Sequence, residues 1–165
     1  MFPLVAFSHV EADECGGLNQ FLAAAPRAVP VCSQVAAMVS VNDLADRPAR
    51  ALADTPHVPH GWENGFMMET RTRTMLCGDL FTQGGSGATP ITESDILGPS
   101  EAFRAPMDYY AHAPHTAGVL EKLARLQPQV LACMHGRAWR GDGAGLIREL
   151  SKTLVNKAMA LPLAA

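Results

Sequence analysis

Short apolar runs alternate along the chain with longer segments in which apolar residues recur every three or four positions. The short runs are PLVAFS at 3–8, VPVC at 29–32 and QVLACM at 129–134, which indicate buried strands. The segments LNQFLAAAP (18–26) and SQVAAMVSVNDLA (33–45) have helical spacing instead. Pro26 ends the first of these predicted helices, and Ser33 is a suitable N-cap for the second.

The second half of the chain continues the alternation. It predicts a hairpin with strands over 66–70 and 74–78, and helices over 101–105, over 116–126 and from residue 143 onward. Ser100 is the expected N-cap of the first of these helices, and Pro106 ends it. Residues 46–64 and the Gly-, Ser- and Thr-rich residues 81–95 are predicted to be irregular. Strands that alternate with helices indicate a layered α/β protein with its site at the carboxyl ends of strands.

Composition narrows the class of protein. With 165 residues, 48% of them hydrophobic and 18% charged, the chain is expected to form a single globular domain over 1–165. The net charge of −3 gives no electrostatic reason to expect a nucleic acid or an anionic membrane as a partner. No apolar run approaches a membrane span, and the first residues lack the features of a signal peptide. The four scattered cysteines indicate free thiols and a cytoplasmic protein.

Side chains that can bind metal ions follow three of the predicted strands. They occur in FSHVEADECGG (7–17), MLCGDLFTQGG (75–85) and LACMHGRAW (131–139). A fourth polar patch, TPHVPHGWENG (55–65), lies in the irregular segment. His9 and Glu11 are two positions apart, which places both on one side of an extended chain, and Asp13 can join them where the chain turns.

Six of these residues form a candidate ligand set for two metal ions, with one carboxylate as the bridge. The set contains three imidazoles and three carboxylates: His9, Glu11, Asp13, His60, Asp79 and His135. For the first cluster alone, a solvated polar turn is the alternative interpretation.

The order of these motifs resembles the metallo-β-lactamase superfold, an αββα sandwich. SHVEADE is followed by a His-bearing loop, by GD after a strand and by MHG before the last helix, and together they cover most of the chain. The His9-x-Glu11-x-Asp13 motif is similar to the HxExD motif of the di-iron flavodiiron proteins. The resemblance implies that His9, Glu11 and His60 bind one metal and that Asp13 and His135 bind the other. Asp79 would bridge the two metals.

The chain departs from the family pattern in several places. Glu14 stands where the family usually has a histidine. Strands that normally precede the first motif, and a short strand pair after Asp54, have no counterpart, so the resemblance implies a truncated version of the fold. Completion of the sheet by association into a homo-oligomer and a fragment of a longer protein both remain open. No flavodoxin-like region follows residue 165, which implies an external electron donor.

Ligand chemistry suggests the metal and the reaction. Glu11 in place of a histidine increases the share of hard oxygen donors, which favours iron or manganese over zinc. With two iron ions, we expect a protein that binds or reduces oxygen or nitric oxide. With zinc, the same fold would serve as a hydrolase of a small-molecule ester, thioester or phosphoester. A non-catalytic sensor or interaction module is the third alternative.

The roles of several other histidines and cysteines can be interpreted in more than one way. His57 lies three positions before His60 and competes with it as the loop ligand. Cys77 and Cys133 each precede a candidate ligand by two positions, so small core residues are favoured and a redox role is the alternative. His112 and His115 flank Pro114 and are expected to be capping or surface residues.

Overall fold

The structure is a computed structural model that describes residues 4–52, 64–85, 89–107, 109–110 and 113–160. Contacts within the chain divide it into two compact units. The described residues of the first unit are 4–52 and 64–65, and those of the second unit begin at Phe66. The single domain over 1–165 stays a prediction.

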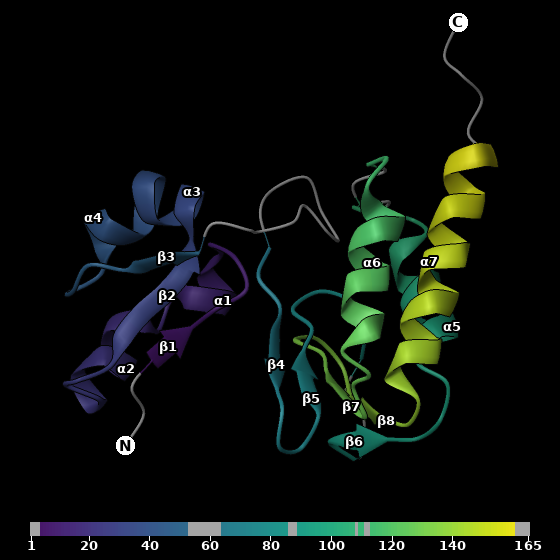
Figure 1. Ribbon diagram of the computed structural model, residues 1–165, viewed down its shortest axis with the longest axis horizontal. Helices are drawn as coiled ribbons and strands as arrows, with labels where there is room; N and C mark the ends of the chain where they lie inside the picture. The colour runs from purple at the N-terminus through teal and green to yellow at the C-terminus, as the bar shows by residue number, and fades with distance from the viewer. Residues whose placement is uncertain (1–3, 53–63, 86–88, 108, 111–112, 161–165) are drawn as a thin grey trace, which may run out of the picture. The chain divides into compact units, whose positions relative to one another are not determined.

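The first unit is a three-stranded parallel sheet with helical connections (Figure 1). Its strands are β1 (Leu4–Ala6), β2 (Val29–Ser33) and β3 (Arg50–Leu52), hydrogen-bonded in the order β1-β2-β3. Its helices are α1 (Ala12–Cys15), α2 (Leu18–Ala24), α3 (Gln34–Ala36), the π-helix η1 (Ala37–Val41) and α4 (Asn42–Leu44). The predicted alternation of strands and helices is thus confirmed for this unit.

Local sequence signals account for the helix ends in the first unit. The Ser33 side chain accepts a hydrogen bond of 2.8 Å from the backbone N–H of Ala36, which confirms the predicted N-cap. The helix α2 ends at Ala24, two residues before Pro26, as the pattern predicts. Leu18 and Leu22 of α2 pack into one core with Cys32 of β2, and this core holds the helix on the sheet.

Two predictions for the first unit were wrong in detail. Among the described residues of the strand predicted over 3–8, Leu4–Ala6 form β1, and Leu4 is partly exposed because β1 pairs with only one neighbour in the described sheet. Residues 46–64 were predicted to be irregular, yet Arg50–Leu52 form β3 and pair in parallel with β2. The exposed side chains of β3 carry no apolar alternation, so the sequence pattern gave no strand signal there.

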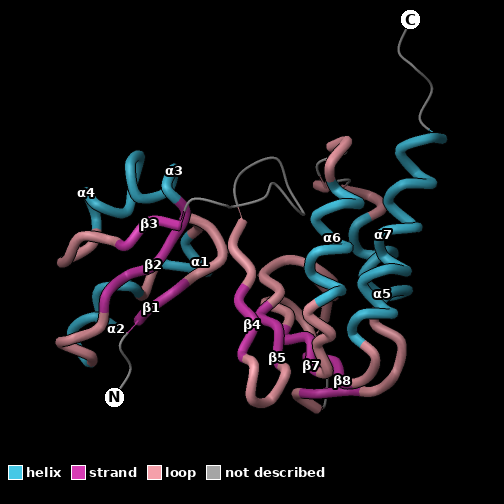
Figure 2. Tube along the Cα trace, in the orientation of Figure 1, coloured by secondary structure: helices cyan, strands magenta, loops and turns pink. Residues whose placement is uncertain are grey.

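The second unit is a five-stranded mixed sheet, and Figure 2 separates its strands from its helices by colour. The strands are β4 (Met67–Glu69), β5 (Thr74–Leu76), β6 (Ile91–Thr92), β7 (Val130–Ala132) and β8 (Ala138–Arg140), in the order β4-β5-β7-β8-β6. The helices are α5 (Leu97–Arg104), α6 (Thr116–Arg125) and α7 (Gly143–Ala160). The predicted hairpin is confirmed as the antiparallel pair β4–β5, and β5 pairs in parallel with β7.

The helices α6 and α7 pack side by side in this unit (Figure 1). Leu120 of α6 and Leu150 of α7 are fully buried in the same core as Met75 and Leu131 of the sheet. Leu126 was predicted on the buried face of α6, but it is 49% exposed because the helix ends one residue earlier, at Arg125.

The start of α5 differs from the prediction. The helix begins at Leu97 and not at Glu101, and Ser100 lies buried inside it. The Asp95 carboxylate accepts hydrogen bonds from the backbone N–H groups of Leu97 and Gly98, so it satisfies the first turn in place of Ser100. Pro99 in the first turn is compatible with this start because no intrahelical hydrogen bond is lost there.

Two short strands were also missed in this unit. Residues 81–95 were predicted to form an irregular loop, but Ile91–Thr92 form β6 and pair with β8. The strand β8 (Ala138–Arg140) was not predicted at all. Strands of two and three residues are too short for an alternating pattern to be recognised. Within the described residues, no helix is both long and apolar enough to cross a membrane.

Candidate metal centre

His9 and Glu11 form a pair just after β1. The His9 side chain is fully buried, whereas the Glu11 side chain is 43% exposed, and His9 Nε2 lies 3.8 Å from Glu11 Oε2. Ser8 Oγ lies 3.0 Å from the other ring nitrogen, Nδ1. A hydrogen bond at Nδ1 orients the ring, and Nε2 is thereby directed at the carboxylate. The structure therefore brings two of the six candidate ligands together in the first unit.

Asp13, the third member of the first motif, lies exposed in the first turn of α1. Its neighbour Glu14 is half-buried. Burial raises the pKa of the Cys15 thiol in the same helix, and the Glu14 and Asp13 carboxylates raise it further. Cys15 therefore stays a protonated thiol at neutral pH and donates a hydrogen bond to the Glu11 carbonyl.

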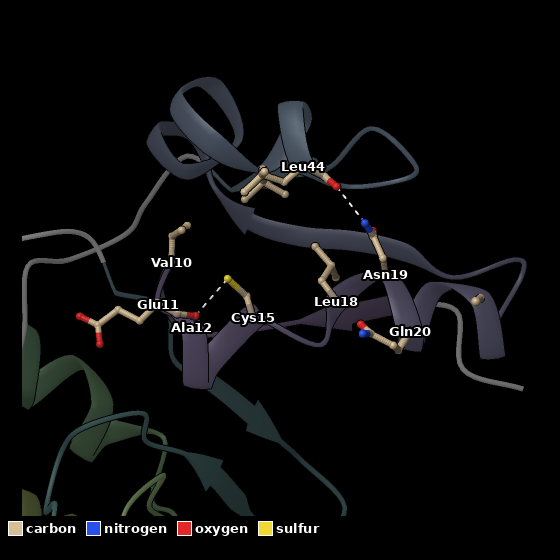
Figure 3. A pocket seen from close by; sticks show the side chains of 11 residues that line it. Val10, Glu11, Ala12, Cys15, Leu18, Asn19, Gln20 and Leu44 are labelled. Atoms are coloured by element: carbon tan, nitrogen blue, oxygen red, sulfur yellow. Dashed lines mark hydrogen bonds between the residues drawn. The ribbon is translucent and has the colours of Figure 1, made fainter.

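A pocket of about 710 Å³ opens beside this motif in the first unit (Figure 3). Its lining is mostly apolar and includes Val10, Leu18 and Leu44. Figure 3 shows the Cys15 thiol bonded to the Glu11 carbonyl, while the Glu11 carboxylate extends away from Leu18. Glu11 is therefore a lining residue whose carboxylate does not join the apolar side chains of the pocket.

Asp79 and His135 form a corresponding pair in the second unit. Each lies three residues beyond the end of a strand, Asp79 after β5 and His135 after β7. His135 Nε2 is 3.5 Å from Asp79 Oδ1, and their side chains are 44% and 14% exposed respectively. Because β5 and β7 are parallel neighbours, their carboxyl ends meet at the same edge of the sheet. The predicted projection of both residues from strand ends is confirmed.

Backbone hydrogen bonds connect the two loops that carry this pair. The N–H of Met134 donates to the Gly78 carbonyl at 3.0 Å, and the N–H of Gln83 donates to the His135 carbonyl at 3.1 Å. The Gln83 side-chain amide also donates to the Arg137 carbonyl. These bonds bracket Asp79 and His135 and fix the separation of their side chains.

Gly136 permits the close approach of the two loops. Its φ of +99° lies in the left-handed region, and a Cβ added there would stand 2.7 Å from Gln83 Cβ. The glycine is thus required both by the backbone conformation after His135 and by the packing of Gln83 against it.

Cys77 and Cys133 lie side by side just before this pair. Cys77 is fully buried and Cys133 is half-buried. The neighbouring Cys133 thiol, together with burial, raises the pKa of the Cys77 thiol well above its ordinary value. Both residues pack with the core of the second unit, as the favoured interpretation of the sequence expected.

Sequence reasoning missed the polar residues around Asp79. Burial raises the pKa of the Tyr109 hydroxyl, and the negative charge of Asp79 acts in the same direction. Arg104, which is almost fully buried, pairs with Glu101 at 2.7 Å and stacks over the Tyr110 ring at 5.2 Å from its centroid. No spacing rule points to these residues, because α5 and the 109–110 segment reach the site only through the tertiary fold.

The described part of the chain thus holds two imidazole–carboxylate pairs, one in each unit. No group of three or more His, Cys, Asp and Glu residues is assembled among the described residues so as to hold a metal ion. His57 and His60 lie outside the described residues. A metal ion bound by a nitrogen and an oxygen at roughly 2.0–2.2 Å holds those atoms about 3 Å apart, so both pairs suit metal ligation with small adjustments. Imidazole nitrogen and carboxylate oxygen are also ligands that iron accepts.

No protein-family model matches the sequence, and no curated protein matches it. Solved structures do. The structure of the chemotaxis sensor ODP as its peroxy diiron species has a TM-score of 0.65 and 15% identity, over 96% of this chain and 70% of that chain. The flavodiiron core of Flv1 from Synechocystis sp. PCC6803 has a TM-score of 0.67 and 19% identity, over 97% of this chain and 44% of that chain. The rubredoxin oxygen:oxidoreductase of Desulfovibrio gigas has a TM-score of 0.68 and 20% identity, over 97% of this chain and 45% of that chain.

These similarities confirm the predicted fold class. The chain has a mixed α/β structure of the metallo-β-lactamase type, and its structural neighbours are flavodiiron proteins and the related sensor ODP. It spans less than half the length of the two flavodiiron chains and 70% of the sensor chain. The chain is therefore shorter than its neighbours, as the sequence comparison of motifs implied.

Proposed function

We propose that this protein binds two metal ions, with iron favoured over zinc or manganese, and that it binds or reduces oxygen or nitric oxide. The observation that carries the proposal is the repeated pairing of an imidazole Nε2 with a carboxylate oxygen. The separations are 3.8 Å for His9 with Glu11 and 3.5 Å for His135 with Asp79, in a chain with the fold of flavodiiron proteins.

The ligand set is the one that the motifs suggest. His9, Glu11 and His60 would hold one metal, and Asp13, Asp79 and His135 would complete the ligand set for the other. When bound, a pair of ferrous ions supplies electrons to a diatomic gas. The imidazoles of His9 and His135 direct Nε2 toward the carboxylates of Glu11 and Asp79, and Ser8 orients the His9 ring through Nδ1. Tyr109 keeps its proton at neutral pH and provides a hydroxyl donor in the electrostatic field of Asp79.

The proposed partners follow from this chemistry. Reduction of oxygen or nitric oxide consumes electrons, so the protein takes them from an external donor, and the neighbour from Desulfovibrio gigas is named for such a partner, rubredoxin. The same proposal includes a single domain over 1–165 and a cytoplasmic location.

A second candidate function is oxygen sensing without turnover. The specific support is the similarity to the chemotaxis sensor ODP, which this chain matches over 96% of its own length. In that role, this chain would bind the gas but would not sustain electron transfer. A zinc-dependent hydrolase of esters, thioesters or phosphoesters is the remaining alternative for the same fold.

Metal competition and gas uptake test the proposal. The purified chain is dialysed anaerobically against equal Fe(II) and Zn(II), excess metal is removed, and bound metal is measured by elemental analysis. We expect iron to be retained, and we expect the iron-loaded protein with a chemical reductant to consume oxygen or nitric oxide. Gas binding without sustained consumption would favour the sensor, whereas zinc retention with esterase turnover would favour the hydrolase.

Matched histidine variants make the test specific. His135→Ala removes a proposed ligand, while His115→Ala removes an exposed histidine at the N-cap of α6. We expect His135→Ala to lose most of its iron retention and His115→Ala to retain iron as the parent does. Equal retention of iron by both variants, at the level of the parent protein, would refute the role of His135.

A further inference from the structure

The second unit contains two thiols on neighbouring strands that its proposed metal chemistry does not use. The register pairs Leu76, the last residue of β5, with Ala132, the last residue of the parallel strand β7. Cys77 and Cys133 directly follow these two residues. The N–H of Cys77 donates to the Ala132 carbonyl at 2.9 Å, which continues the pairing at this point. The two cysteines are therefore 56 positions apart in the sequence but adjacent across the sheet.

The two side chains lie on the same face of the sheet. Met75 and Leu131, two positions before the cysteines, are partners in the register and are both fully buried in the core. Side chains two positions apart share a face of a strand, so both thiols follow these residues toward the core side. The two cysteines are therefore neighbours on one face of the sheet.

The backbone spacing permits a covalent bond between them. Neighbouring strands lie about 4.8 Å apart. Cα atoms joined by a disulfide lie roughly 4.4–6.8 Å apart. Each thiol is otherwise bonded only weakly, to the carbonyl two residues before it, at 3.4 Å for Cys77 and 3.9 Å for Cys133. Rotation of the side chains can replace these contacts at little cost.

We propose that Cys77 and Cys133 form a reversible disulfide that joins β5 to β7 under oxidising conditions. This inference concerns the second unit alone and does not depend on the proposed metal function. Cys133 is half-buried and reacts first, whereas Cys77 is fully buried and is reached only through Cys133. Cys15 and Cys32 belong to the first unit and provide internal comparisons.

The oxidant is a low-molecular-weight disulfide such as oxidised glutathione. The Cys133 sulfur attacks one sulfur of the oxidant, which forms a mixed disulfide and releases one glutathione thiol. The Cys77 sulfur then attacks Cys133 Sγ, breaks the mixed disulfide and releases the second glutathione thiol. The two protein thiols together lose two electrons and two protons. The oxidised glutathione gains these electrons and protons and becomes two glutathione thiols.

The disulfide would act on the strand ends from which two polar residues extend. Asp79 and His135 each lie two residues beyond a cysteine of the pair. A bond between the strands therefore restrains the starting points of both loops. Because a link between adjacent strands departs from the least strained disulfide geometry, we expect it to be reduced readily.

Peptide mapping of the full chain tests the inference. The metal-free protein is treated with oxidised glutathione, residual thiols are blocked under denaturing conditions, and the chain is cleaved with trypsin after Lys and Arg. Cys77 falls in the peptide 74–104 and Cys133 in the peptide 126–137. We expect these two peptides to be joined, with a combined mass lower by two hydrogen atoms, and to separate after treatment with dithiothreitol.

Two variants distinguish this pair from other thiols. Cys133→Ser should abolish the crosslink and leave Cys77 unmodified in the folded protein, whereas Cys15→Ser should form the crosslink as the parent does. Circular dichroism verifies that each variant is folded. Persistent alkylation of both Cys77 and Cys133 in the oxidised parent protein, or joining of Cys133 to Cys15, would overturn the proposal.

Discussion

At the scale of single residues, Gly136 is the position where backbone conformation and packing coincide. Its φ is +99°, and an added Cβ would meet Gln83 Cβ at 2.7 Å. We expect Gly136→Ala to lower the free energy of unfolding by about 1–3 kcal/mol, because both the left-handed backbone and the contact with Gln83 are strained. Urea unfolding followed by circular dichroism measures this change.

Gly118 provides the matched control. It lies exposed inside α6 and an added Cβ would meet nothing within 4 Å. Gly118→Ala is expected to raise the free energy of unfolding by about 0.5–1 kcal/mol, because alanine loses less conformational entropy in a helix. Similar effects of the two substitutions would contradict the account of Gly136.

The sequence was informative about residues that follow apolar runs and uninformative about those brought in by the fold. Asp79 and His135 could be predicted at strand ends because each follows a short apolar run directly. Tyr109 could not, since its proximity to Asp79 arises from the packing of a distant segment. Gln83 was likewise hidden, because its role depends on where the chain returns after β7.

At the scale of elements, the start of α5 is a testable correction. The Asp95 carboxylate accepts hydrogen bonds from Leu97 and Gly98, whereas the buried Ser100 hydroxyl has no hydrogen-bond partner among the described residues. We expect Asp95→Ala to lower the free energy of unfolding by about 1 kcal/mol through loss of the cap. Ser100→Ala is expected to change it by no more than about 0.5 kcal/mol. The reverse order in a urea titration would restore the helix start at Glu101.

The packing of α6 on α7 includes an exposed ion pair that should depend on pH. Arg148 Nε lies 2.9 Å from Glu121 Oε2, and the hydrogen bonds from Arg148 lower the pKa of Glu121 below its ordinary value of 4.5. A lowered folded-state pKa contributes stability above the unfolded pKa, and that contribution is lost as pH falls through the folded pKa. The stability difference between the parent and Glu121→Gln should therefore be present at neutral pH and disappear in acid.

Thermal unfolding at low salt over a range of pH values measures this difference. Arg148→Gln removes the same pair from the other helix and should reproduce the loss at neutral pH, while the double variant should lose little more than either single one. Additive losses in the double variant would show that Glu121 and Arg148 act independently.

Element prediction succeeded where an element was long or strongly patterned. The hairpin β4–β5, the strand β7 and the helices α6 and α7 were predicted from apolar spacing and are confirmed. The strands β3, β6 and β8 have two or three residues each, so pairing with a neighbour and not their own pattern defines them. The helix α5 began early because the cap came from Asp95, outside the apolar pattern.

At the scale of the whole molecule, the fold agrees with the motif order, and the shared metal centre stays a proposal. The motifs predicted a metallo-β-lactamase-type chain, and similar structures cover up to 97% of it. Each unit contributes one imidazole–carboxylate pair, His9 with Glu11 and Asp79 with His135. The motifs could predict these residues as candidate ligands because they follow apolar runs, whereas His60 lies outside the described residues.

The most direct measurement is the iron content per chain for the parent and for one ligand variant from each unit. After anaerobic loading with Fe(II), we predict about two iron ions per chain in the parent. His9→Ala and Asp79→Ala should both fall well below that value, because both residues belong to the proposed ligand set. Less than one iron ion per parent chain, or iron content unchanged in both variants, would contradict a dinuclear centre built from these residues.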